Sequence, residues 1–389
     1  MTADTHSGPL QGVRVLEMGQ LIAGPFAGSR LADFGADVIK IEPPGRGDPM
    51  RDWGKKVNET SLWWAVIARN KRSVAADLST DEGRDVIREL ARDADAIVEN
   101  FRPGTLERWG LGPDELHAIN PRLIIVRISG FGQTGPYSAR PGFASVGEAM
   151  GGLRYINGFP GEVPPRCGIS LGDTLAALFA FEGLLMALYW RDARGGTGQV
   201  VDASILESCF AMLESTLPDY DKLGVVREPT GTSLKNLAPS NVYPTKEGRH
   251  IVIAANADPM FRRLAAAMNK PELAEDPRFA THIPRGENAE EIDRIITEWS
   301  SSLTYADVTR SLDAHAVVWG PINSIADIVA DPHAQERGMI VRQPDERFGE
   351  LAVPGVVPKL SKTPGRVNWL GRAEPGDDNA VVLRRTEHE

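Results

Sequence analysis

Short apolar runs alternate with helix-length segments through the first half of the chain, and this alternation constrains the fold more than any other feature. The apolar runs predict strands at residues 13–18, 36–42, 96–100, 123–129 and 199–204. Between them, residues 24–35 and 79–95 predict helices, the second with Ser79 as N-cap and Glu82 as its capping-box partner. Strands that alternate with helices form a mostly parallel sheet, so we expect an α/β fold with a Rossmann-like large domain.

The second half of the chain has a different pattern. A chain of 389 residues exceeds the size at which one core stops growing, so we expect two domains. Residues 218–250 are rich in Pro, Gly and Asn, which is typical of a long connection. An apolar run at 250–256 and helical patterns near 258–269 and 287–303 then predict a smaller α+β domain. We place the small domain at residues 223–326 and the large domain, with its linkers, at residues 1–222 and 327–389.

Charge and cysteine content limit the partners and the compartment. The formal net charge of -10 argues against nucleic acid and against an anionic membrane surface as partners. Cys167 and Cys209 are too few for a disulfide framework, which fits a reducing cytoplasm. The N-terminus has no apolar signal core, and we expect the longest apolar stretch, which Glu182 interrupts, to be too short and too well flanked to span a membrane. The sequence therefore predicts a cytoplasmic protein.

One short motif matches a dinucleotide-binding pattern only in part. Residues 130–135, "GFGQTG", follow a predicted strand and match the three-glycine dinucleotide pattern. In that pattern the third glycine enters a helix, but here Pro136 follows at once, and no acidic residue for the ribose lies between Gly151 and Gly161. There is no Walker loop, and the seven histidines include no pair spaced i, i+4. We expect no bound cofactor and no metal, and a nicotinamide-dependent oxidoreductase is the less favoured alternative.

Asp173 stands at the start of a helix-length apolar segment whose only other charge is Glu182. An Asp at a helix start is a favoured N-cap, which stabilises a helix by about 1 kcal/mol. The following residues are apolar around nearly the whole helix circumference, which predicts a buried helix. The positive end of the helix dipole favours a charged carboxylate. Asp173 is therefore either a plain N-cap or an ionised nucleophile in a poorly hydrated site.

Longer segments together resemble one known family over nearly the whole chain. They lie at residues 8–51, 69–78, 98–112, 128–143, 172–180 ("GDTLAALFA") and 320–333 ("GPINSIADIVADPH"). With these segments the chain resembles the class III CoA-transferases, the family that contains formyl-CoA transferase, carnitine CoA-transferase and α-methylacyl-CoA racemase.

The resemblance implies a covalent mechanism at Asp173. In transferases of this family an aspartate at this position attacks the acyl-CoA thioester, which gives a mixed anhydride and free CoA thiolate. The thiolate then attacks the aspartyl carbonyl, so that the donor acid leaves and an aspartyl-CoA thioester remains. The acceptor acid reverses these steps. The partners implied are an acyl-CoA and a small carboxylic acid.

The resemblance also implies a quaternary structure and a CoA site. Family members form an interlocked homodimer, in which each subunit threads through a ring in its partner and the C-terminal tail completes the large domain. Arg108 is expected to contact a CoA phosphate, because a guanidinium suits phosphate. The full set of implied CoA-binding residues is Ile22, Ala23, Ala76, Ser79, Asn100, Phe101, Arg102 and Arg108.

Two departures from the family pattern narrow the activity. The racemase branch carries a His followed by an Asp where this chain has Phe143 and Ala144, and formyl-CoA transferase carries a Gln where this chain has Ile22. The pattern is most similar to branches that move CoA from succinyl-CoA to dicarboxylic or hydroxydicarboxylic acids, and a racemase or epimerase is the alternative. We expect Arg154 or Arg166 to pair with the distal substrate carboxylate, because both lie near Asp173 in sequence and Arg binds carboxylates in a bidentate manner.

Overall fold

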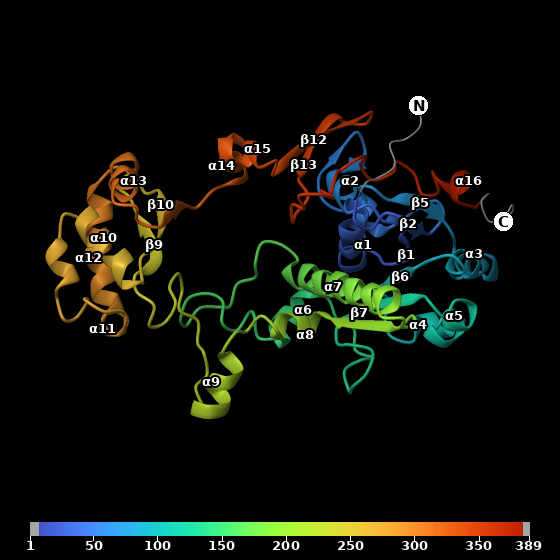
Figure 1. The fold of residues 1–389 in the computed structure, drawn as a ribbon, viewed down its shortest axis with the longest axis horizontal. Coiled ribbons are helices and arrows are strands. Elements are labelled where there is room, and N and C mark those ends of the chain that lie inside the picture. Colours follow the sequence, from blue (N-terminus) through green and yellow to red (C-terminus); the bar gives the residue numbers. More distant parts are fainter. Residues whose placement is uncertain (1–7, 384–389) are drawn as a thin grey trace. The chain divides into compact units, whose positions relative to one another are not determined.

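The computed structural model describes residues 8–383 and divides into two compact units (Figure 1). The larger unit comprises residues 1–153, 166–217 and 332–389, and the smaller one residues 154–165 and 218–331. These boundaries differ from the expected small domain of residues 223–326 by a few residues at each end. A larger difference is the segment Arg154–Pro165, which we expected in the large domain and which belongs to the smaller unit. Its turns carry no helical or strand periodicity by which a pattern could assign it.

A six-stranded parallel sheet forms the centre of the larger unit, as the alternating pattern predicts. Its spatial order is β5 (Arg72–Ala75), β2 (Asp37–Glu42), β1 (Arg14–Glu17), β6 (Ala96–Glu99), β7 (Ile124–Ser129) and β8 (Val200–Ser204). Counted along the chain this is the order 3-2-1-4-5-6, in which ligands bind at the carboxyl ends of the strands, where the order reverses between β1 and β6. Strand β5 was missed in the sequence because it is short and begins within a charged run.

Alternate side chains of the strands enter two cores, one on each face of the sheet. Val15 of β1 belongs to the core that α1 (Ala23–Asp33) and α7 (Leu171–Ala193) cover. The next residue, Leu16, belongs to the opposite core, beneath α3 (Asp81–Ala91) and α5 (Pro113–Ile119). The sheet is therefore covered by helices on both faces.

The starts of two helices differ from the predicted ones. Thr80 is the N-cap of α3, since its side chain accepts a hydrogen bond from the Gly83 N–H at 3.1 Å. Ser79, the predicted cap, instead donates to Asp77 at 2.7 Å in the preceding turn. In α7 the N-cap position belongs to Ser170, so Asp173 lies inside the first turn. Of the two alternatives for Asp173, the plain N-cap is therefore wrong.

Helix α7 is less buried than its composition indicates. Its inner face packs against α1, β7 and β8, but an apolar stripe faces outward, formed by Leu178, Met186, Tyr189 and Trp190. With 23 residues, α7 is also the one helix within residues 8–383 that is long and apolar enough to cross a membrane, so the expectation that this stretch is too short is wrong. Length and composition alone are weak evidence for a membrane span, because core helices share both properties.

The smaller unit is built on a three-stranded antiparallel sheet in the order β11 (Trp319–Pro321), β10 (His250–Ala254) and β9 (Ser240–Pro244). Tyr243 and Phe261 are fully buried in its core. Its helices are α10 (Asp258–Ala267), α11 (His282–Glu287), α12 (Ala289–Ser302), α13 (Tyr305–Ala314) and α14 (Ile325–Ala330), with a 3-10 turn at Pro271–Ala274. Residues 218–250, expected as a connection, also contain β9 and most of α9 (Thr216–Leu223).

The C-terminal tail returns to the larger unit. The Gly371 N–H donates to the Ala65 carbonyl at 3.0 Å, and the Asn70 N–H to the Trp369 carbonyl at 3.1 Å. Val382 enters the core beneath α3 and α5. The tail contains α15 (Pro332–Glu336), the hairpin β12 (Ile340–Asp345) and β13 (Gly349–Pro354), and α16 (Asn379–Val382). The remaining elements of the larger unit are a 3-10 turn at Pro49–Asp52, β3 (Lys56–Val57), β4 (Thr60–Ser61), α2 (Leu62–Ile67), α4 (Thr105–Arg108), α6 (Ala144–Met150) and α8 (Ile205–Phe210).

Candidate active site

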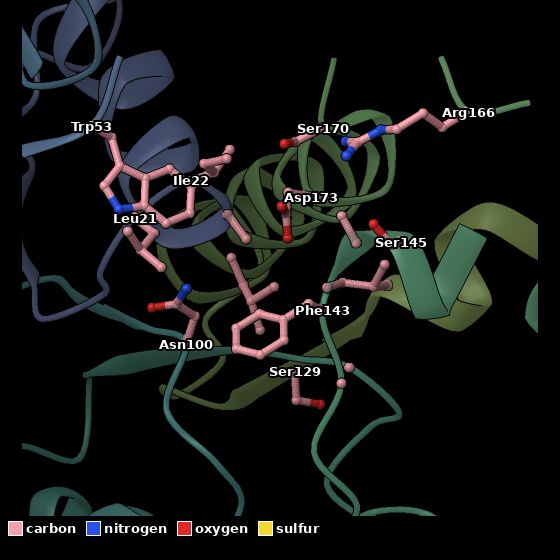
Figure 2. Close-up of a pocket in the computed structure, with 16 residues that line it drawn as sticks. Leu21, Ile22, Trp53, Asn100, Ser129, Phe143, Ser145, Arg166, Ser170 and Asp173 are labelled. Atoms are coloured by element: carbon pink, nitrogen blue, oxygen red, sulfur yellow. The ribbon is translucent and has the colours of Figure 1, made fainter. Parts of the chain in front are cut away.

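A cavity of about 260 Å³ lies at the carboxyl ends of β1, β6 and β7, where the strand order of the sheet reverses. All of its lining residues belong to the larger unit. They are Leu21, Ile22, Ala23, Trp53, Asn100, Ile128, Ser129, Gly130, Gly142, Phe143, Ala144, Ser145, Arg166, Ser170, Asp173 and Ile205. Figure 2 shows the Asp173 carboxylate, at the start of α7, pointing into this cavity.

The loop between β1 and α1 forms one wall and is held by its neighbours. The Asn100 side chain accepts from the Gln20 N–H at 2.7 Å and donates to the Gln20 carbonyl at 2.9 Å. Gly19 is required here, because a Cβ atom at this position would lie 2.9 Å from the Asn100 side-chain oxygen. Leu21 has a positive φ of 62°, a backbone conformation that is uncommon outside glycine and clusters at functional sites.

Four fully buried charged side chains form ion pairs next to this loop and hydrogen-bond to its backbone. Lys40 lies 2.7 Å from Asp48 and 3.2 Å from Glu17, and Lys71 lies 2.6 Å from Glu17. Lys71 also donates to the Pro25 carbonyl at 2.6 Å, and Asp48 accepts from the Leu21 N–H at 3.1 Å. Burial alone would lower the pKa of Lys40, but Asp48 and Glu17 raise it above its ordinary value. We call Glu17, Lys40, Asp48 and Lys71 the buried ion network.

Asp173 occupies the third position of α7 and accepts no hydrogen bond from the residues that the structure describes. The Gly172 N–H, which a capping side chain would usually take, donates instead to the Glu148 carboxylate at 3.0 Å. Glu148 comes from α6 and is 3% exposed. The Asp173 carboxylate is therefore free to meet a bound molecule.

The charge state of Asp173 differs from the simple helix-dipole expectation. Burial, and after it the Glu148 carboxylate, raise the pKa of Asp173 to about 6, although the Arg166 guanidinium offsets part of the shift. Arg166 is held by the Cys167 and Ile169 carbonyls, both at 3.2 Å, and in Figure 2 it extends toward Ser170. At neutral pH Asp173 is mostly ionised, but as a more basic carboxylate than an ordinary Asp.

The predicted CoA-binding residues fall into two groups. Ile22, Ala23 and Asn100 line the cavity. The others lie outside its lining, next to β5 and β6 at the same edge of the sheet: Ala76 is buried, Ser79, Arg102 and Arg108 are exposed, and Phe101 packs edge-to-face on Trp109 with ring centroids 5.2 Å apart. Arg108 donates to the Thr105 hydroxyl at 2.9 Å. Of the two arginines expected to bind carboxylate, Arg166 lines the cavity, and Arg154 belongs to the smaller unit.

The glycines at residues 130–135 form a turn after β7. Strand β7 ends at Ser129, and the next helix, α6, begins only at Ala144, so no helix starts after Gly135. Gly132 and Gly135 have φ values of 88° and 83°, which L-residues rarely adopt. The structure thus lacks the helix N-terminus on which a dinucleotide pyrophosphate rests in that motif.

Sequence reasoning missed Trp53, Ser145 and Glu148. Trp53 packs on Trp63 with centroids 6.2 Å apart and lines the cavity next to Ile22. The sequence carries a signal for Glu148, because it is the one acidic residue in a helix otherwise made of small and apolar residues.

Comparison with known proteins shows the family of the chain. A family model described as CoA-transferase family III matches residues 10–378. The chain belongs to this family. It is 52% identical to a succinyl-CoA–D-citramalate CoA-transferase of Chloroflexus aurantiacus over 96% of this chain and 93% of that one. It is 43% identical to the alpha subunit of a succinyl-CoA–L-malate CoA-transferase of Chloroflexus aurantiacus, over 93% of this chain and 85% of that one.

A solved structure supports the same assignment. A CaiB/BaiF family protein from Brucella suis is 32% identical and matches with a TM-score of 0.86, over 97% of this chain and 99% of that chain. The predicted family membership and the mixed α/β fold with a parallel central sheet are confirmed. As a family III CoA-transferase, the chain is an enzyme that transfers CoA. Within residues 8–383, no group of three or more His, Cys, Asp or Glu side chains could hold a metal ion.

Proposed function

We propose that this CoA-transferase moves CoA from succinyl-CoA to a small dicarboxylic or hydroxydicarboxylic acid, with Asp173 as the catalytic nucleophile. The observation that carries the proposal is the Asp173 carboxylate, which points into the cavity and has no hydrogen bond within residues 8–383. The citramalate- and malate-specific names of the relatives support the substrate class.

The proposed reaction conserves the thioester bond. Asp173 attacks the thioester carbonyl of succinyl-CoA, the C–S bond breaks, and CoA thiolate leaves from a mixed anhydride. The thiolate attacks the aspartyl carbonyl and releases succinate. The acceptor carboxylate then attacks the aspartyl-CoA thioester, and the returning thiolate completes the new acyl-CoA and frees Asp173. The cycle needs no metal and no resident cofactor, and it can proceed in a reducing cytoplasm.

The charge state of Asp173 suits this role. Because burial raises the pKa of Asp173 to about 6, the carboxylate is ionised at neutral pH and more basic than an ordinary Asp. Below pH 6 it becomes protonated and cannot attack. We therefore propose that activity falls as the pH drops through about 6.

The CoA moiety is proposed to lie along the carboxyl edge of β1, β5 and β6. Ile22, Ala23 and Asn100 would contact the part nearest the thioester, because they line the cavity with Asp173. The exposed guanidinium groups of Arg102 and Arg108 are available for phosphates. Ala76, Ser79 and Phe101 complete the proposed CoA site.

Arg166 is proposed to bind the distal carboxylate of the substrate, because it lines the same cavity as Asp173 and carries a bidentate donor. We expect Arg166→Met to reduce kcat/KM for dicarboxylate acceptors by about tenfold or more, with little change for monocarboxylates of similar size. Arg154→Met is the matched variant in the smaller unit. If each variant lost the same factor in kcat/KM for dicarboxylates and for monocarboxylates, an arginine–carboxylate contact would be contradicted.

One experiment separates this function from its alternatives. The enzyme is incubated with succinyl-CoA and a panel of mono-, di- and hydroxydicarboxylic acids, and the acyl-CoA products are identified by mass spectrometry. New dicarboxylyl-CoA species support the proposal. Deuterium wash-in at the α-carbon without acid exchange would indicate a racemase, for which Phe143 and Ala144 offer no base. Tight NAD(H) binding without new thioesters would indicate an oxidoreductase.

A further inference from the structure

Glu148 is a buried carboxylate that the proposed reaction does not use. It lies in α6, is 3% exposed and does not line the cavity. Its carboxylate accepts the Gly172 N–H at 3.0 Å, in the first turn of α7. Gly172 makes this approach possible, because a Cβ atom there would lie 2.9 Å from Ile205 and 3.2 Å from the Glu148 side chain.

This contact holds a second carboxylate beside Asp173. Acidic residues in the first turn of a helix commonly bond to the free N–H groups there. Here Glu148 takes the N–H of the residue next to Asp173. The Asp173 carboxylate itself points into the cavity (Figure 2).

Few other charges act on Asp173. Arg166 approaches from the segment before α7 and favours the ionised form of Asp173. From α8 comes Cys209, whose pKa is raised by burial, Glu148 and Asp173 to about 11, so that it is a neutral thiol at physiological pH. The other charged groups on the elements packed against α7 have partners of their own. On α1, Arg30 pairs with Asp33, and Arg127 of β7 pairs with Glu99 of β6. Asp202 of β8 accepts the Gln133 N–H, and Glu207 of α8 bonds to Ser204.

We infer that Glu148 is a positioning residue that holds the start of α7 and, by its charge, disfavours the free Asp173 carboxylate relative to the acylated one. This inference rests on the proposed function. When the enzyme is loaded, the C–S bond of the donor breaks and a C–S bond to the Asp173 carbonyl forms, while the negative charge moves from Asp173 to the released acid. Repulsion by Glu148 is relieved in that step, so loading becomes more favourable.

The pKa of Asp173 and the equilibrium for its loading with CoA should change together. A proton and an acyl group both neutralise Asp173, so both relieve the same repulsion. Removing the charge of Glu148 should therefore shift the acidic limb of the pH profile of kcat/KM to lower pH. The same change should make the formation of aspartyl-CoA less favourable. For each pH unit by which the limb moves, the loading equilibrium should fall by about tenfold.

The test uses Glu148→Gln, which keeps an oxygen to accept the Gly172 N–H and removes only the charge. The loaded fraction is measured with succinyl-CoA and succinate at fixed ratio, by hydroxylamine trapping of the Asp173 peptide. We expect the limb to move down in pH and the loaded fraction to fall by the linked factor. Glu182→Gln, an exposed charge on the same helix, is the control and should change neither quantity.

The outcomes separate the inference from the function on which it rests. If wild-type enzyme gives no trapped Asp173, the proposed function fails. If wild-type enzyme is trapped at Asp173 but Glu148→Gln changes neither the limb nor the loading, the inference is wrong. Should Glu148→Gln not fold, carboxyl ¹³C NMR of the wild-type enzyme replaces it, and an Asp173 that titrates in the ordinary Asp range would overturn the inference.

Discussion

At the residue scale, Asp173 shows what a single sequence can and cannot predict. Its isolation before an apolar segment was readable and indicated a site. The sequence did not reveal that Asp173 leaves the helix start uncapped, because the Gly172 N–H is bound by Glu148 of α6, which lies 24 residues earlier. The raised pKa of Asp173 has the same origin, since burial and the Glu148 carboxylate are tertiary effects that no local pattern reveals.

The raised pKa predicts that Asp173 costs stability. A carboxyl group whose folded pKa is about 6, against 3.8 ordinarily, binds its proton more tightly in the folded state, so it destabilises the fold increasingly as the pH rises from about 4 to 6. We expect Asp173→Asn to be more stable than wild type above pH 6 by about 1–3 kcal/mol, since solvent in the cavity screens part of the burial penalty. The gain should vanish near pH 4. Urea unfolding at pH 4 and pH 7.5 measures it, and a destabilised Asn variant at pH 7.5 would contradict the account.

At the element scale, apolar runs predicted most strands of the sheet, but they did not predict the loop that forms the cavity wall. That loop depends on charged residues within strands, Glu17 in β1 and Lys40 in β2, which interrupt an apolar pattern. They pair across strands and with Asp48 and Lys71 from segments far along the chain. Such pairing is set by strand order, which periodicity does not contain.

The buried ion network should be sensitive to the loss of one partner. Lys71→Met removes one of the two cations that face Glu17 and the contact with the Pro25 carbonyl. We expect it to lower the free energy of unfolding by about 3–5 kcal/mol, because it leaves a buried carboxylate poorly compensated. Lys56→Met, in an exposed pair with Asp52, should leave the free energy of unfolding nearly unchanged. Equal urea midpoints for the two variants would show that the network does not stabilise the fold.

At the scale of the whole molecule, the parallel sheet and the presence of two units followed from the alternation of patterns and from chain length. The assignment of Arg154–Pro165 to the smaller unit did not, because this segment is separated from residues 218–331 by α7 in the sequence. The outward apolar stripe of α7 was also unexpected. Exposed apolar surface of this kind is typical of a protein–protein contact, which supports the proposed homodimer.

An interlocked homodimer predicts a specific kinetic property. Two threaded rings cannot separate unless a chain unfolds, so subunits should not exchange under native conditions. Tagged and untagged enzymes are purified separately, mixed for days, and passed over an affinity column for the tag. We expect no untagged subunit to be retained until the mixture has been unfolded in urea and refolded. Retention after native mixing would contradict the interlocking, and a single-subunit mass by sedimentation would contradict the dimer.

The central claim is that Asp173 carries the acyl group and CoA in turn, and trapping tests it directly. Wild-type enzyme is incubated with succinyl-CoA, treated with hydroxylamine and cleaved with trypsin. Cleavage after Arg166 and Arg191 releases residues 167–191, in which Asp173 and Glu182 are the only carboxyl side chains. We predict a hydroxamate at Asp173 in wild type, and none in an inactive Asp173→Asn variant. A hydroxamate at Glu182 or elsewhere, or an active Asn variant, would contradict the claim.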